Sequence, residues 1–222
     1  MTDLWPDRLT PRAVSFTPAL AVRRGPRSFA GVSQHVASDA GYWRARLTDI
    51  DVRGDKVKLL RAMLARMQGG LNAVLLGPFD CAHGPIASGA VGRVRGIPYS
   101  DGATFSDGGG FVNTSVLAET TESVELRETE LTMAFEGGLQ IEAGQYFSLP
   151  GDRLHIVTSA VEYSAGNWTV QFWPPARGAL AGAQPVDLAQ PRCKMRLASD
   201  VESLDLDMLR FGKATLDFEE AP

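Results

Sequence analysis

A cysteine and a histidine lie two residues apart at Cys81 and His83, and another histidine, His155, follows later in the chain. A cysteine hydrolase needs such a pair together with a group that activates the thiol, often a helix N-terminus. Cys81 lies in a loop bounded by Pro78 and Pro85, and the sequence predicts no helix after it. Zinc requires about four ligands at recognisable spacing, and this loop offers two. We therefore expect no catalytic residue and no metal site here. Labelling of Cys81 by a thiol-reactive substrate mimic would revive the hydrolase alternative.

The loop-rich stretch 86–112 contains two Ser-Asp-Gly steps, at 100–102 and 106–108. A calcium loop would need a ladder of acidic residues and a distal Glu, and both are missing. The glycines 108–110 are not followed by the Lys-Ser/Thr and helix of a phosphate loop. Neither a dinucleotide fingerprint nor a Gly-x-Ser-x-Gly motif occurs. We predict that the chain binds no cofactor and is not an enzyme.

Large aromatic residues are the remaining candidates for a binding site. Trp168 and Trp173, together with Tyr146 and Tyr163, could form a platform on which a sugar ring stacks. Aromatic residues of small β domains also serve as core, so both interpretations stay open. Loss of glycan-array binding on Trp168→Ala would support a carbohydrate-binding module.

The bulk composition limits the class of partner. The 222 residues carry 22 Lys and Arg against 26 Asp and Glu, a net charge of −4. An acidic chain has no electrostatic basis for sequence-specific nucleic-acid binding. The N-terminus lacks the apolar core of a signal peptide, and no apolar run approaches the ~20 residues of a membrane helix. We expect synthesis in a cytoplasm and no membrane segment.

The first 28 residues are punctuated by prolines and carry five arginines. This pattern predicts an extended arm that orders on its own domain or on a neighbouring subunit. The last 24 residues are acidic, so the two ends could pair within or between subunits. The candidate subunit-contact residues of the arm are Trp5, Arg8, Arg12, Phe16, Arg23 and Arg24.

Hydrophobic periodicity predicts one helix among many short strands. Residues 55–68 repeat apolar side chains at helical spacing, with Asp55 as a possible N-cap and Gly69-Gly70 as the stop. Residues 29–50 predict a hairpin in which Trp43 and its alternating partners point inward. The segment 139–175 alternates apolar residues between glycine and proline turns, which is typical of a small barrel or sandwich.

Several stretches of the chain resemble one protein family in their order along the sequence. They are RSFAGVSQHVASDAGYWRARL, the helix followed by GGLNAVLLGPFD, IPYSDGATFSDGGG, GQYFSLPGDRLHIV with its later WPP, CKMRLASD, and GKATLDFEEA. Together they resemble the distal tail proteins of long-tailed phages and gene transfer agents. The resemblance covers nearly the whole chain and includes no catalytic signature.

This resemblance implies a mainly β fold in two domains. Residues 1–112 with 191–222 would form a β-sandwich with the helix 55–68, and residues 113–190 an inserted small β-barrel of the OB type. Such proteins form rings, typically hexamers, in the virion tail. They join the tail tube protein to the hub and tip proteins around a channel for the tape-measure protein and later DNA.

Other structural roles in a virion remain open alternatives. A head–tail connector or a peripheral minor tail protein differs from a distal tail ring mainly in its position within the particle, which sequence does not reveal. A carbohydrate-binding module at the tail tip is the alternative from a different class.

Overall fold

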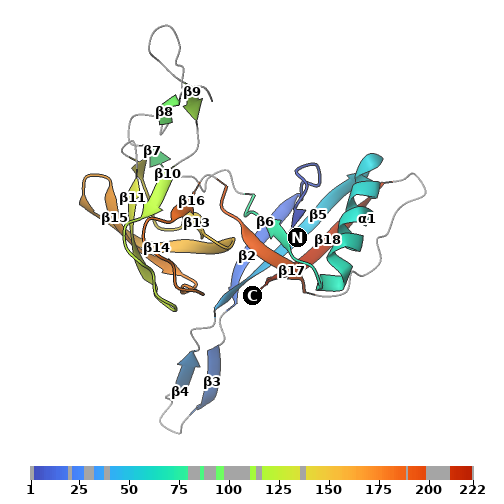
Figure 1. The fold of residues 1–222 in the computed structure, drawn as a ribbon. Coiled ribbons are helices and arrows are strands. Elements are labelled where there is room, and N and C mark those ends of the chain that lie inside the picture. The colour runs from blue at the N-terminus through green and yellow to red at the C-terminus, as the bar shows by residue number, and fades with distance from the viewer. Residues whose placement is uncertain are drawn as a thin grey trace. The chain divides into compact units, whose positions relative to one another are not determined.

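The computed structural model describes residues 3–19, 22–27, 33–37, 41–79, 86–87, 94–97, 111–113, 117–135, 139–188, 190–198 and 211–221. The chain forms two compact units: unit 1 comprises residues 1–79 with 192–222, and unit 2 comprises residues 80–191. Within the described part, strands dominate and one α-helix is present (Figure 1). The predicted mainly β class, with one packed helix and a small barrel, is confirmed.

Unit 1 is built on a six-stranded sheet. Its order is β1 (Asp3–Leu4), β6 (Val74–Leu76), β17 (Cys193–Leu197), β18 (Phe211–Glu220), β5 (Tyr42–Arg53) and β2 (Ala13–Ala19). β1 runs parallel to β6, and every other pair is antiparallel. The sheet therefore contains strands from the N-terminal and C-terminal parts of the chain together with the more central strand β6.

The hairpin predicted over 29–50 is replaced by a different pairing. β4 (Ser33–Ala37) pairs with β3 (Val22–Arg27), and β5 pairs with β2 on one side and β18 on the other. A strand has only two hydrogen-bonding edges, and both edges of β5 are taken by strands other than β4. The local sequence pattern that predicted a hairpin therefore did not decide the partner of β5.

The side chains of β5 alternate as predicted. Trp43, Ala45 and Leu47 are buried, whereas Arg44 and Arg46 are exposed. Beyond Leu47 the register against β18 shifts.

This shift is a β-bulge in which Thr48 and Asp49 lie opposite one residue of β18, and Asp49 has a φ of 55°. Because of the bulge, Ile50 and Val52 point to the buried face. The buried residues of β5 are therefore odd-numbered before the bulge and even-numbered after it.

The helix α1 spans Asp55–Met67, and the 3-10 turn η1 spans Gln68–Gly70. The helix predicted over 55–68 is thus confirmed to within one residue. Its buried face is formed by Val57, Leu60, Met63 and Met67.

The expected N-cap was wrong by one position. Gly54 is the N-cap, with φ 55° and ψ −120°, and no side chain caps the helix. Asp55 instead occupies the first turn, where its carboxylate lies near the positive end of the helix dipole.

The end of the helix makes a close backbone contact with β17. Gln68 adopts the left-handed conformation, and Gly70 follows with a φ of 94°. A Cβ atom at Gly70 would lie 2.7 Å from the carbonyl oxygen of Leu197. This approach explains why glycine ends the helix here, as the sequence indicated.

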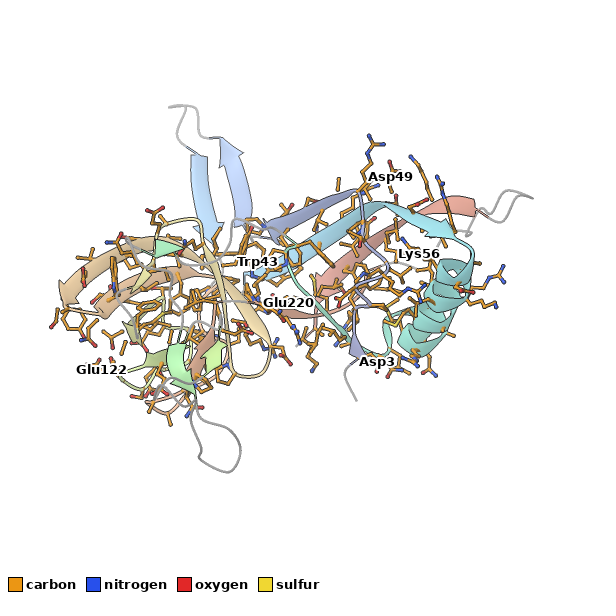
Figure 2. All side chains as sticks on the ribbon, turned by 90° about the horizontal axis from the view of Figure 1, so that it is seen from above. Asp3, Trp43, Asp49, Lys56, Glu122 and Glu220 are labelled. Atoms are coloured by element: carbon orange, nitrogen blue, oxygen red, sulfur yellow. The ribbon has the colours of Figure 1, made fainter. Side chains whose placement is uncertain are left out.

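Among the described residues of unit 1, the core is apolar with one buried acid at its margin. Trp5 packs edge-on against Phe218, with ring centroids 5.9 Å apart. Glu220 is 7% exposed, and its Oε2 accepts a hydrogen bond of 2.9 Å from the backbone N–H of Trp43 (Figure 2). A carboxylate thus completes the hydrogen bonding between the ends of β5 and β18. Cys193 of β17 is also buried.

Unit 2 contains a closed barrel of six strands (Figure 1). Around the barrel, each neighbouring pair is antiparallel. Closure leaves these strands without an open edge, which is how a small sheet avoids pairing with other chains. The order is β10 (Leu117–Thr120), β11 (Glu130–Phe135), β15 (Asn167–Trp173), β14 (Arg153–Ser164), β13 (Tyr146–Leu149) and β16 (Pro185–Asp187).

The barrel core largely follows the predicted alternation. Val170 and Phe172 of β15 are buried. On β14, however, His155 and Val157 are buried along with Leu154, and Ile156 is only half-buried. Two successive residues of β14, Leu154 and His155, are therefore buried.

The structure assigns residues 80–112 to unit 2, whereas the predicted boundary placed them in the first domain. β7 (Ile86–Ala87) pairs with β12 (Leu139–Gln140), which ties this stretch to the barrel segment of the chain. The other described part of the stretch is β8 (Val94–Ile97), paired with β9 (Phe111–Asn113). In the part of the chain described here, no helix has the length and hydrophobicity to span a membrane.

Candidate functional site

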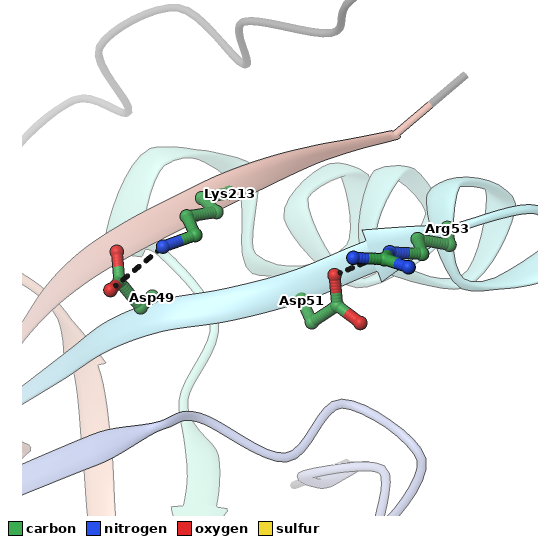
Figure 3. A network of polar contacts seen from close by, with 4 residues as sticks. All are labelled: Asp49, Asp51, Arg53 and Lys213. Carbon is green, nitrogen blue, oxygen red and sulfur yellow. Dashed lines mark hydrogen bonds and ion pairs between the residues drawn. The ribbon is translucent and has the colours of Figure 1, made fainter. Parts of the chain in front are cut away.

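The face of the unit 1 sheet opposite its core carries paired charges. Lys213 Nζ on β18 donates to Asp49 Oδ2 at 3.1 Å, across the bulge of β5 (Figure 3). Within β5, Arg53 Nε donates to Asp51 Oδ1 at 3.0 Å. The bulge at Asp49 is what turns its carboxylate toward β18, because it adds one residue to β5 at this point.

A third pair continues this charged face along the same two strands. Arg46 Nε lies 3.6 Å from Asp217 Oδ1. Side chains of the three pairs are between 36% and 71% exposed, so each pair stabilises the fold by at most about 1 kcal/mol. Positive and negative groups alternate over the face, which therefore suits a polar partner surface of mixed charge better than an apolar one.

The predicted N-terminal arm is built into unit 1. Trp5 is 2% exposed, and its indole Nε1 donates to the carbonyl of Leu9 at 2.9 Å. Phe16, on β2, is half-buried and packs edge-on against Trp43. Trp5 therefore acts as a core side chain of its own unit.

The arginines of the arm occupy two different places. Arg8 and Arg12 are exposed, and both precede β2. Arg23 and Arg24 lie on β3, opposite Val36 and His35, and their side chains fall outside the described part. Among the described side chains of the arm, the exposed cations are therefore Arg8 and Arg12.

β2 lies at one end of the sheet order. Its seven residues pair with β5 along their whole length, and no described strand lies beyond it. An edge strand presents backbone N–H and C=O groups to any incoming strand. Together with Arg8 and Arg12, this edge is the described surface of unit 1 best suited to contact a second chain.

The two tryptophans proposed for sugar stacking do not form one platform. Both lie on β15, five residues apart, so their side chains leave the strand on opposite faces. Trp168 packs against the barrel core, and its indole Nε1 is buried without a hydrogen-bond partner among the described residues. Trp173 is half-buried at the far end of the strand.

His155 is a polar side chain in the interior of unit 2. It is 1% exposed and stacks on Phe147, with ring centroids 5.3 Å apart, while Phe172 meets it edge-on at 4.9 Å. Its Nδ1 lies 2.7 Å from the carbonyl oxygen of Pro174. A carbonyl oxygen only accepts, so Nδ1 carries the proton of this hydrogen bond.

Burial lowers the pKa of His155 from 6.5 to about 3. The bond to Pro174 opposes this shift, and the nearby guanidinium groups of Arg177 and Arg153 add to it. The imidazole is therefore neutral near pH 7. Its Nε2 is then a hydrogen-bond acceptor, and it has no partner among the described residues.

Cys81 and His83, and both Ser-Asp-Gly steps, lie outside the described residues. His155 lies in the barrel, surrounded by phenylalanine rings. Within the described ranges, no group of three or more His, Cys, Asp or Glu side chains is placed to hold a metal ion.

No family model and no curated protein matches the sequence. The function is therefore inferred from the residues and the fold.

Two features of the site were not predicted. The paired charges at Asp49 depend on a bulge, and the sequence of β5 has no glycine or proline to mark it. The sequence did contain an indication that His155 is buried. His155 lies two residues before Val157 on the same strand, so both side chains point to the same, buried face. A histidine at a position with apolar periodicity is a useful indicator of a buried polar group.

Proposed function

We propose that the chain is a ring-forming structural protein of a phage-type virion tail, located at the distal end of the tail tube. In this role, copies of the chain contact one another and join the tube protein to hub and tip proteins. The channel of the ring holds the tape-measure protein and later passes DNA. The chain performs no catalysis in this role.

The way unit 2 is inserted supports this proposal most. β6 and β17 are antiparallel neighbours, and Cys193 lies opposite Leu76, although 116 residues separate them in the sequence. A closed barrel is thus inserted between two adjacent strands of an otherwise continuous sheet. This plan agrees with the order of segments that resembles distal tail proteins, some of which carry an inserted small barrel.

The surfaces of unit 1 are consistent with self-association. The edge of β2 offers backbone hydrogen bonds, and Arg8 and Arg12 add positive charge beside it. The chain as a whole is acidic, so a basic segment on one copy finds negative charge on the next. A closed ring uses one such head-to-tail contact repeatedly.

The proposal is tested by the mass of the assembled protein. The purified full-length chain, alone and mixed with candidate tail tube and hub proteins, is examined by native mass spectrometry and electron microscopy. We expect rings, with a mass about six times that of the 23.9 kDa chain if the ring is a hexamer. A chain that stays monomeric with every such partner would contradict the proposal.

Charge reversal locates the contact. Arg8→Glu with Arg12→Glu should weaken ring formation, because a basic segment becomes acidic beside the β2 edge. Lys58→Glu with Arg61→Glu is the matched control: both are cations on exposed positions of α1, and the net charge changes equally. Equal ring formation by the two double variants would rule out the N-terminal contact.

A further inference from the structure

Within the closed ladder of the barrel no strand has an open edge, but β14 continues beyond this ladder on one side (Figure 1). β13 pairs with β14 only over residues 153–156, whereas β15 pairs with β14 as far as Ser164. In the described part of the chain, no strand pairs with residues 158–164 on the side away from β15. The second half of β14 is therefore an edge strand, which can accept a further strand.

This edge carries exposed apolar side chains. Val161 is 61% exposed and Tyr163 is 58% exposed. Edge strands that are protected from pairing often carry lysine or proline, and residues 158–164 contain neither. Their only charged side chain is Glu162. A β-bulge at each end leaves residues 159–162 as the regular stretch of the edge.

The hydrogen bonds of β15 show which backbone groups of the edge are left over. The N–H of Phe172 donates at 2.8 Å to the carbonyl of the residue that precedes β11, so the even-numbered residues of β15 face β11. The odd-numbered residues face β14, and among them Thr169 lies opposite Val161. The backbone groups of Val161 are therefore bonded to β15, whereas those of Ala160 and Glu162 point to the open edge.

We propose that this edge pairs with the same edge of a second copy, in antiparallel orientation about a twofold axis at Val161. In this register, Ala160 lies opposite Glu162 of the partner subunit, and Glu162 lies opposite Ala160 of the partner subunit. Each of these pairs exchanges both of its N–H···O bonds. Every backbone group that Ala160 and Glu162 present at the edge then has a partner.

The side chains favour the same register. Val161 lies opposite Val161 of the partner subunit in a non-hydrogen-bonded pair, where facing side chains come closest, and apolar pairs of this kind stabilise a sheet. A register that places Glu162 opposite Glu162 of the partner subunit would set two carboxylates against each other, which is unfavourable. The edge is thus complementary to itself, as a twofold contact requires.

Sedimentation velocity of the full-length chain over a range of concentrations tests the contact. Val161→Lys should weaken this self-association about tenfold or more, because the two introduced charges face each other across the twofold axis. Gln171→Lys is the matched control: it is exposed on β15, which is paired on both sides, and it changes the net charge equally. The wild-type and Gln171→Lys chains should reach double the mass of the Val161→Lys chain.

This contact is independent of the ring proposal. The expected doubling is a ratio between variants, and it holds whether the smaller species is a single chain or a ring. A Val161→Lys chain that forms rings, or one that stays monomeric, therefore decides the ring proposal separately from the contact at β14.

Cross-linking tests the register. Val161→Cys should form a disulfide between two copies on mild oxidation, because the Cα atoms of a non-hydrogen-bonded pair lie about 4.5 Å apart, within the range that a disulfide spans. Gln171→Cys should not, since β15 lies one strand away from the edge. The wild-type chain, treated in the same way, accounts for the native cysteines.

Hydrogen exchange followed by NMR tests the backbone bonds. The amide protons of Ala160 and Glu162 should become protected as the concentration of the chain rises. The amide proton of Val161 should be protected at every concentration, because it is bonded to β15 within one copy.

Three results would overturn the proposal. Equal masses for the wild-type and Val161→Lys chains at every concentration would show that the edge does not pair. Open-ended aggregates in place of a doubling would show that it pairs without a defined register. A Val161→Cys chain that does not cross-link, or amides of Ala160 and Glu162 that exchange equally at all concentrations, would place any association elsewhere.

Discussion

His155 is a titratable side chain that the fold buries in the interior of unit 2, where the charged imidazolium form is energetically unfavourable. Phe147 and Phe172 surround the ring, and the backbone carbonyl of Pro174 fixes its tautomer. A neutral histidine with a lowered pKa makes the stability of unit 2 depend on pH. The direction follows from the two pKa values, 6.5 for an unhindered histidine and about 3 in the folded chain.

Between pH 6.5 and pH 3, the unfolded chain binds a proton at this histidine and the folded chain does not. The free energy of unfolding should therefore fall as the pH is lowered through this window, by up to about 1.4 kcal/mol per pH unit from this group. Below about pH 3 both states are protonated and the contribution is constant. Urea unfolding followed by NMR at several pH values between neutral and about pH 4 measures the slope for unit 2.

The comparison variant for this slope is His155→Asn, which retains an N–H donor for Pro174 and does not titrate. The stability of unit 2 in this variant should depend less steeply on pH, whatever its absolute value. Identical slopes in the two proteins across the acidic part of this window would show that His155 titrates normally when folded.

At the level of elements, α1 and β17 meet through the backbone at Gly70. The φ of 94° is unfavourable for any residue with a side chain, and a Cβ atom at this position would lie only 2.7 Å from Leu197 O. The helix end thereby lies directly on the strand, and no side chain separates them.

Gly70→Ala should destabilise unit 1 by about 3 kcal/mol, because backbone strain and the clash with Leu197 add together. Gly144 is the matched control: its φ is also 94°, and no atom lies within 4 Å of the position of a Cβ. Gly144→Ala should cost unit 2 only about 1 kcal/mol, from strain alone. A urea titration followed by NMR reads the two units separately, and equal losses would mean that the clash at Gly70 relaxes freely.

Across the whole molecule, the two units have separate cores. The apolar cluster of unit 2 lies within the barrel segment, and the chain leaves and rejoins the unit 1 sheet at neighbouring strands. The insertion therefore interrupts the sequence of unit 1 without interrupting its sheet.

Unit 1 should fold without the barrel. Replacing residues 80–191 with a short Gly-Ser linker between Phe79 and Arg192 should give a chain with strand-type circular dichroism and a cooperative urea transition, because Leu76 and Cys193 are already paired. The barrel segment expressed by itself is the companion test. A non-cooperative transition in the shortened chain would show that unit 1 depends on the barrel for its stability.

The alternation of apolar residues was sufficient to predict the helix, the buried face of β5 and the strands of the barrel. Each of these depends on periodicity within a few residues, and burial of one face fixes it. The partner of β5, the bulge at Asp49 and the neighbours of His155 were not predictable in this way. They depend on strands distant in sequence, and a single sequence contains no local signal for such pairings.

Apolar periodicity and turn residues act locally, so the class of fold and the position of the helix could be predicted from the order of the residues. The insertion of one domain into another was implied only by the resemblance to a family. The place of β2 at a sheet edge and the burial of Trp5 in the core became known from the packed fold. The same is true of the position of His155 near two arginines. These features arise when distant strands pack together, and burial and proximity are properties of that packing.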